Sequence, residues 1–376
     1  MAGLYIHIPF CGSRCVYCDF YSTTSLELRE QYVDCLCEEL KMKRTAEPIF
    51  ASGDTCTTIE TIYFGGGTPS LLTPPQILRI LRCIAKYFTL APDIEVTLEA
   101  NPQDLHKTYI TSLLGIGINR LSIGCQSFQN DFLKFLHRRH TAEQAIQVVE
   151  LAGQCGFENI SVDLIYGLPK QTLKDFQQDI QTALSLPVKH ISTYCLTIEE
   201  NTTLHKMFLK DKSLQQDDET LNDMYSMLCE KLNSWYHYEV SNFAINQQFI
   251  SQHNSSYWNN TPYLGIGAGA HSYDGKNTRS WNISNLQKYI SEIKKGVLPC
   301  EKEILTDEDR LTELVMLRLR TKEGINLTSL NEQIRNKLLS KAKPFIESGK
   351  LKIADNHLSA TRQGIAILNL IIEELI

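Results

Sequence analysis

Short runs of apolar and β-branched residues alternate with longer stretches of helical periodicity over the first half of the chain. Six runs have the length and composition of buried strands, namely Leu4–Ile8, Thr61–Phe64, Ile94–Leu98, Arg120–Ile123, Ile160–Leu164 and His190–Tyr194. Each precedes a segment of helical spacing, such as Leu26–Lys43 or Gln76–Tyr87. This alternation is typical of βα units around a parallel sheet, and six units predict an α/β fold with a partial parallel (β/α)6 barrel.

The alternation stops after Asn201, where a helical segment around Asp218–Tyr236 leads into Gly- and Asn-rich sequence from Ser241 to Asn285. From about Glu301 the pattern is helix, helix, a hairpin-like stretch and a final helix from Thr361, which suggests a small winged-helix-like module. We therefore expect a barrel core over 1–205, a barrel extension over 206–300 and a mainly helical C-terminal domain over 301–376. The helical end could equally cap the barrel.

Composition excludes several classes of protein. The chain has 376 residues, of which 43% are hydrophobic and 21% charged, so we expect an ordinary globular protein. The formal net charge is -6 and the basic residues are scattered, which argues against nucleic acid as a partner. No export signal or organellar presequence is visible, and no run approaches the ~18 apolar residues that a membrane span needs. We expect a cytoplasmic protein without a transmembrane segment.

Three of the twelve cysteines stand out by their spacing. Cys11, Cys15 and Cys18 form a C-x3-C-x2-C motif in the loop after the first predicted strand. Three thiolates can hold three irons of a 4Fe-4S cluster and leave the fourth iron open to a chelating ligand. A zinc site is the alternative, but zinc usually requires four ligands and no second cysteine pair stands nearby. The other nine are interpreted as packing residues, namely Cys35, Cys37, Cys56, Cys83, Cys125, Cys155, Cys195, Cys229 and Cys300.

With this motif the chain resembles, over nearly its whole length, the radical S-adenosylmethionine (SAM) proteins of the oxygen-independent coproporphyrinogen III oxidase-like family. The resemblance implies that the amine and carboxylate of SAM chelate the open iron. It also implies that an electron from the cluster cleaves SAM to a deoxyadenosyl radical, so that an electron donor is required.

Further polar and glycine residues sit at or just past the predicted strand ends. The turn Gly65–Gly67 follows the second strand, and glycine there allows a ligand to approach the backbone, although such a turn is weak evidence by itself. Glu99, Gln126 and Asp163 lie at the ends of later strands, where single polar residues are often merely solvated. The resemblance implies SAM contacts for Tyr5, Tyr17, Gly66, Gly67, Thr68, Glu99, Gln126, Arg138 and Asp163. It also matches the segment Gly265–Ser272 to a cofactor-lining segment of the family.

The family divides into oxidases and HemW-type haem chaperones, and three features favour the chaperone branch. Phe20 stands where the oxidases carry a fourth cysteine, and the chain starts directly before the first strand, without the oxidases' N-terminal extension. The third feature is the HNxxYW motif of His253, Asn254, Tyr257 and Trp258. An imidazole is a common axial ligand of haem iron and aromatic rings offer flat apolar surfaces, so His253 is the first candidate ligand. The alternative is a packed aromatic turn in which His253 only hydrogen-bonds.

The resemblance therefore favours a haem chaperone that binds haem, a 4Fe-4S cluster and SAM and passes haem to an acceptor haem protein. Catalytic turnover is not required for this role. The alternatives are a coproporphyrinogen III oxidase of porphyrin biosynthesis, which would decarboxylate two propionates at the expense of SAM, and a radical SAM enzyme acting on another substrate. The sequence identifies neither the haem acceptor nor the electron donor.

Overall fold

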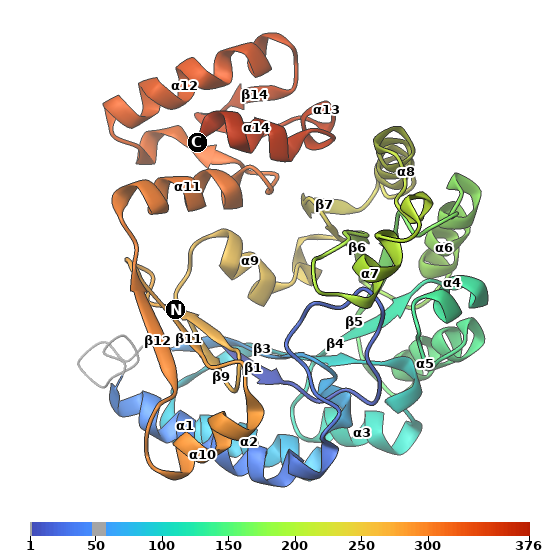
Figure 1. Ribbon diagram of the computed structural model, residues 1–376, viewed down its shortest axis with the longest axis vertical. Coiled ribbons are helices and arrows are strands. Elements are labelled where there is room, and N and C mark those ends of the chain that lie inside the picture. The colour runs from blue at the N-terminus through green and yellow to red at the C-terminus, as the bar shows by residue number, and fades with distance from the viewer. Residues whose placement is uncertain (1, 47–57) are drawn as a thin grey trace.

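One twelve-stranded sheet forms the centre of the molecule (Figure 1). The computed structural model describes residues 2–46 and 58–376. Strand order is β12-β11-β10-β9-β1-β2-β3-β4-β5-β6-β8-β7, so β12 and β7 are the edges and the described sheet does not close. The βα core of this sheet consists of six parallel strands, namely β1 Ala2–Ile8, β2 Ile59–Gly66, β3 Leu90–Ala100, β4 Arg120–Gln126, β5 Asn159–Tyr166 and β6 His190–Cys195. They confirm the predicted parallel βα core.

Helices cover the outer face of these strands, as the alternating pattern predicts (Figure 1). They are α1 Arg29–Ala46, α2 Pro74–Tyr87, α3 Lys107–Gly115, α4 Asn130–Phe135, α5 Ala142–Gln154 and α6 Leu173–Ser185. Short 3-10 helices occur at Leu26–Leu28, Pro69–Leu71, Pro102–Asp104, Lys212–Leu214, Gln247–Phe249 and Leu327–Ser329. Helix α2 buries Ile77, Ile80 and Ile84 at helical spacing, so one apolar stripe faces the sheet. Thr141 and Thr172 begin α5 and α6 with capping boxes.

The chain after β6 extends the sheet at both ends. On the β6 side it adds β8 Asn242–Ala244 and β7 Tyr236–Glu239, and on the β1 side β9 Tyr263–Ile266, β10 His271–Tyr273, β11 Thr278–Asn282 and β12 Cys300–Ile304. Between and beside them lie α7 Thr203–Phe208, α8 Asp218–Lys231, α9 Gln252–Trp258 and α10 Leu286–Lys294. Sequence reasoning missed these strands, because they have only three to five residues and therefore show no clear alternating pattern.

The helix predicted over Asp218–Tyr236 is too long. Helix α8 ends at Lys231, and Tyr236 is already the first residue of β7. Asn233 and Ser234 between them are weak helix formers, and the aromatic residues that follow pair as a strand with β8. Tertiary pairing here overrides the apparent helical spacing.

The C-terminal unit combines helices with a three-stranded sheet of order β13-β15-β14. Its elements are α11 Asp307–Arg318, β13 Ile325–Asn326, α12 Glu332–Glu347, β14 Leu351–Ala354, β15 His357–Ala360, α13 Arg362–Ile365 and α14 Leu368–Leu375. The predicted hairpin is present, but the final helix is interrupted at Ile367, whose φ of -124° is not helical. Residues 301–304 pair in the large sheet as part of β12. No helix in the described ranges is long and apolar enough to span a membrane.

A buried ion pair on α1 forms hydrogen bonds to strands β9 and β11. Glu39 and Lys43 lie 3.1 Å apart, and both side chains are almost completely buried. Lys43 Nζ also donates to the carbonyl of Gly265 at 2.7 Å, and Glu39 accepts from Asn282 at 2.6 Å and from Tyr289 at 2.5 Å. Every charge in this network therefore has partners, as burial requires.

Candidate functional site

The loop that carries the three cysteines is fixed by hydrogen bonds at its two ends and at its middle. Its base is formed by Phe10 and Thr23, which form a parallel bridge, while Cys11 N donates to Thr23 O at 2.9 Å. In the middle of the loop, Val16 N donates to Leu136 O and Val16 O accepts from Leu204 N. Val16, Leu136 and Leu204 also share a small apolar core. The loop is thereby fixed between β1, the end of α4 and α7.

The three thiols line one cavity of about 450 Å³, here called the thiol cavity. Thr68 Oγ1 lies 3.6 Å from Cys11 Sγ, and Arg138 Nη1 lies 3.4 Å from Cys15 Sγ. Burial raises the pKa of Cys11 and raises the pKa of Cys18 to about 11. Without a cation, the thiols of Cys11 and Cys18 are protonated at neutral pH, so binding of iron would release protons from these two groups.

The donor set suits a cluster better than a single ion. Among the described residues, no three His, Cys, Asp or Glu side chains converge so that they could hold one metal ion. A 4Fe-4S cluster makes a different demand, because each thiolate binds a different iron and the ligands stay apart. Three thiols on one short loop and one cavity meet that demand. Cys11, Cys15 and Cys18 would hold the cluster.

Two glycines allow the cysteine loop to approach β2. Gly66 has a φ of 110°, and a Cβ there would lie 2.5 Å from the ring of His7. A Cβ on Gly67 would lie 2.8 Å from the carbonyl oxygen of Phe10 and 3.0 Å from Cys11 Sγ. A side chain at Gly67 would push the loop away, and one at Gly66 would displace His7, so both glycines are required by close packing.

Polar side chains from the strand ends meet in the thiol cavity, as the parallel sheet predicts. Glu99 accepts from Tyr63 at 2.8 Å and from Gly66 N at 3.2 Å, and burial raises its pKa to about 7. Asp163 accepts from Ser122 at 3.1 Å, and burial raises its pKa as well. Carboxylates in such positions can accept hydrogen bonds from ribose hydroxyls or an ammonium group.

The cavity also includes most of the other predicted SAM contacts. Tyr17, Gly66, Gly67, Thr68, Gln126 and Arg138 all belong to its lining. Tyr5 does not: its hydroxyl bonds His7 Nδ1 at 3.1 Å, and its ring stacks near His253 inside the barrel. Its contact with SAM stays a prediction.

Asn101 is a lining residue that sequence reasoning missed. It donates to Thr68 Oγ1 at 3.2 Å and accepts from Arg138, which also donates to the Gly124 carbonyl at 2.7 Å. Asn101 thus connects the glycine turn with the arginine beside Cys15. Its position directly after β3 is the same signal that selected Glu99, so the sequence could have revealed it.

The HNxxYW residues lie on α9, beside the parallel strands. His253 is only 1% exposed, and both of its ring nitrogens have partners: Nδ1 bonds Thr61 Oγ1 at 2.8 Å and Nε2 bonds the Tyr257 hydroxyl at 2.9 Å. Its backbone N–H donates to Glu95 at 3.0 Å. Burial lowers the pKa of His253 to about 3, so the ring is neutral.

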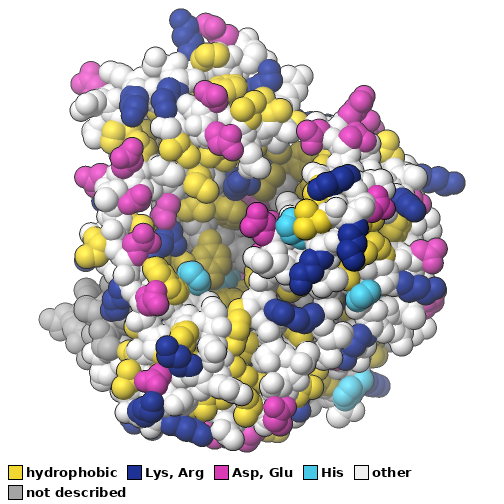
Figure 2. Space-filling view, viewed as in Figure 1, with side chains coloured by type: hydrophobic (Ala, Val, Ile, Leu, Met, Phe, Trp, Pro, Cys, Tyr) yellow, Lys and Arg dark blue, Asp and Glu magenta, His cyan; other side chains and the backbone are white. Residues whose placement is uncertain are grey.

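Asn254, Tyr257 and Trp258 line a second cavity of about 480 Å³, here called the aromatic cavity. Its full lining is Tyr194, Glu239, Val240, Ser241, Asn242, Asn254, Tyr257, Trp258, Leu317 and Arg320. Leu317 and Arg320 come from the C-terminal unit, and Figure 2 shows the molecule hollowed where that unit faces the barrel. Tyr194 also lines the thiol cavity, so the two cavities are neighbours.

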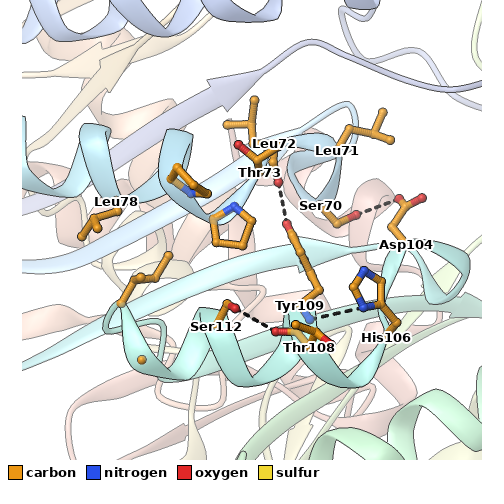
Figure 3. A pocket seen from close by; sticks show the side chains of 14 residues that line it. Ser70, Leu71, Leu72, Thr73, Leu78, Asp104, His106, Thr108, Tyr109 and Ser112 are labelled. Atoms are coloured by element: carbon orange, nitrogen blue, oxygen red, sulfur yellow. Dashed lines mark hydrogen bonds between the residues drawn. The ribbon is translucent and has the colours of Figure 1, made fainter.

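Other candidate features lie away from these cavities. The segment Gly265–Ser272 is not part of the lining of the thiol cavity, and a Cβ on its Gly267 would lie 2.3 Å from the Tyr32 hydroxyl beneath it. A larger cavity of about 900 Å³ lies between the start of α2 and α3 (Figure 3). Within it, Tyr109 donates to Leu72 O and Ser70 donates to Asp104. None of the predicted site residues lines this cavity.

The fold and the thiol cavity together define the class of the molecule. A partial parallel barrel with three cysteines after the first strand and a glycine turn after the second is the arrangement of radical SAM proteins. In agreement, the Radical SAM superfamily matches residues 5–183. The HemN C-terminal domain family matches residues 305–367, which form most of the C-terminal unit.

Relatives and solved structures narrow the class. Proteins named Heme chaperone HemW are 35% identical in Bacillus subtilis, over 97% of this chain and 96% of the relative, and 36% identical in Lactococcus lactis, over 89% and 84%. The solved coproporphyrinogen III oxidase (HemN) of Escherichia coli has a TM-score of 0.83 and covers 100% of this chain and 89% of its own, but at 23% identity it shows the shared fold alone. This chain belongs to the HemW family of radical SAM proteins.

Proposed function

We propose that this chain is a haem chaperone, which binds haem as cargo and transfers it to an acceptor haem protein. The observation that carries the proposal is the aromatic cavity, because Tyr257, Trp258 and Tyr194 supply flat surfaces beside the thiol cavity. Arg320 at the same cavity supplies a cation, and haem propionates are anionic. Relatives of similar length that carry the name heme chaperone support the same function.

The resident cofactors of the proposal are a 4Fe-4S cluster on Cys11, Cys15 and Cys18 and SAM in the thiol cavity. When bound, they supply one-electron reducing chemistry, which requires an external electron donor. The chain's own residues position them: Gly66 and Gly67 let the ligand approach the backbone, Glu99 and Asp163 accept hydrogen bonds, and Arg138 places a cation beside Cys15. A cytoplasmic location belongs to the proposal as well.

The test is haem uptake and delivery by the purified, anaerobically reconstituted protein. We expect about one haem per chain to remain bound through desalting and to activate an apo-peroxidase added as acceptor. Bovine serum albumin loaded with haem controls for passive release. Haem that is lost on desalting, or that reaches the peroxidase no faster than from albumin, would contradict a chaperone function.

A further inference from the structure

The residue best placed to bind iron in the aromatic cavity is not His253. That histidine does not line the cavity, and each of its ring nitrogens already has a hydrogen-bond partner within 2.9 Å. To reach a haem iron, it would have to give up its hydrogen bond to Thr61 or Tyr257 and leave a buried polar group unpaired, which is unfavourable. The histidine is therefore held as part of the protein interior.

Tyr257 differs from His253 in its position. It lines the aromatic cavity, and its hydroxyl oxygen is a group that binds ferric haem as a phenolate. It follows His253 by four residues on α9, so both side chains lie on the same helical face, and their 2.9 Å bond joins the cavity to the barrel interior.

The lining of the aromatic cavity also contains polar atoms that could bind a ligand with polar groups. Within the part of the chain that the structure describes, Trp258 Nε1 and Asn242 Oδ1 are buried and have no hydrogen-bond partner. Asn242 is 4% exposed, and both residues line this cavity. Buried polar atoms are almost always paired in proteins, so two exceptions in one cavity indicate a missing polar ligand.

We propose that Tyr257 is the axial ligand of ferric haem in the aromatic cavity, with His253 and Thr61 as the residues that receive its proton. This inference rests on the proposed haem-carrying function and assigns its iron ligand. His253 is a positioning residue in this arrangement, because it acts through the tyrosine and does not touch the iron.

The hydrogen bonds from Tyr257 through His253 to Thr61 allow Tyr257 to lose its proton without leaving a buried charge on the imidazole. A neutral imidazole satisfies both neighbours in either tautomer. With the proton on Nδ1, the Tyr257 hydroxyl donates to Nε2 and Nδ1 donates to Thr61. When the tyrosine oxygen bonds to iron, its proton passes to Nε2 and the Nδ1 proton passes to the Thr61 oxygen. Thr61 releases one proton to solvent in the cavity that it lines with Gln252 and Ser256, and its remaining O–H donates a hydrogen bond to Nδ1. The water ligand of free ferric haem is displaced by the tyrosine oxygen.

The test compares variants by the spectrum of bound haemin. In the wild type we expect the phenolate-to-iron charge-transfer band and the phenolate modes in resonance Raman. Tyr257→Phe should lose both and bind haemin at least tenfold more weakly, while Tyr257→His should show an imidazole-type spectrum. His253→Gln should keep the band but require a higher pH for ligation. The matched control is Tyr263→Phe, whose ring contacts Tyr257 but does not line the cavity, and it should behave as wild type.

Two results would overturn the assignment of Tyr257 as the iron ligand. They also distinguish failure of this assignment from failure of the proposed haem-carrying function. If the wild type binds haemin with an imidazole-type spectrum that Tyr257→Phe retains and His253→Gln abolishes, the ligand is His253 and haem carriage still stands. If the wild type binds no haemin at all, the proposed function itself fails. Circular dichroism and the thermal midpoint of each variant establish that it folds, and the changed spectrum of Tyr257→His provides a signal that loss of folding cannot mimic.

Discussion

The surroundings of individual cysteines separate the three predicted ligands from the rest. Cys11, Cys15 and Cys18 share one loop, whereas most of the other described cysteines pack among helices and strands away from the cavity. Cys195 is an exception, since it also lines the thiol cavity, where it lies against Tyr166. Cys56 lies outside the described residues. One cavity thus holds both the candidate ligands and a matched control.

Replacement of single cysteines tests the ligand assignment. We expect Cys11→Ala, Cys15→Ala and Cys18→Ala each to abolish the visible absorbance of the reconstituted iron-sulfur cluster, because three thiolates are needed to hold it. Cys195→Ala, in the same cavity, should retain the absorbance and the iron content. Full iron content in any of the first three variants would show that the ligand has been misplaced.

Buried histidines should make the protein sensitive to acid. Burial lowers the pKa of His140 to about 4 from its ordinary value of 6.5, so the unfolded chain binds a proton more readily than the folded one. The stability that this histidine contributes is complete above pH 6.5 and is lost as the pH falls toward 4, by at most about 3 kcal/mol.

The measurement is urea unfolding of His140→Gln and wild type between pH 7 and pH 4. We expect the variant to lose less unfolding free energy over this range than the wild type. The exposed His137, which has a positive φ of 58°, provides the control as His137→Asn, because asparagine tolerates that conformation. Parallel curves for wild type and His140→Gln would contradict this, because they would show that the pKa of His140 is the same in the folded and unfolded states.

Residue patterns predicted the thiol cavity better than the aromatic one. Glu99, Gln126 and Asp163 were found because the ends of parallel strands meet at one face, and the structure brings them together. The role of His253 could not be predicted in the same way, because one of its partners, Thr61, lies 192 residues away in the chain. A hydrogen-bond partner at such a separation appears only once the chain is folded.

At the level of elements, the strands that can be predicted are those that are followed in the sequence by a recognisable turn and helix. Each parallel strand is a short apolar run followed by a turn and a helix, so its period and length both appear in the sequence. Strands β9 to β12 lack that signature and depend on pairing with β1 and with one another. Context rather than local propensity fixes such strands.

The buried pair of Glu39 and Lys43 gives a test of how α1 is attached to those strands. Lys43→Met would leave the Glu39 carboxylate buried and without its cation, and we expect a loss of about 3–5 kcal/mol in the free energy of unfolding. The double variant with Glu39→Gln should lose less than Lys43→Met alone. Lys41→Met, which breaks an exposed pair with Glu38 on the same helix, should change the free energy by less than about 1 kcal/mol. Equal losses at positions 41 and 43 would contradict the buried network.

At the scale of the whole molecule, the C-terminal unit completes the aromatic cavity. Its backbone joins the barrel through Val240 N, which donates to Arg320 O at 2.9 Å, and through Lys322 N, which donates to Tyr238 O at 3.0 Å. Because Leu317 and Arg320 complete the lining, a movement of this unit would open or close the cavity. The sequence predicts the unit itself but not this contact, which depends on how the two parts pack.

The measurement that tests the central claim most directly is one anaerobic reaction that contains the cluster-loaded protein, haemin, coproporphyrinogen III, SAM and a reductant. Haem on the protein and porphyrins in solution would be followed by absorption and chromatography. A chaperone should retain about one haem per chain and leave coproporphyrinogen unchanged. Conversion of coproporphyrinogen to protoporphyrinogen, without retained haem, would contradict the account and identify the chain as an oxidase.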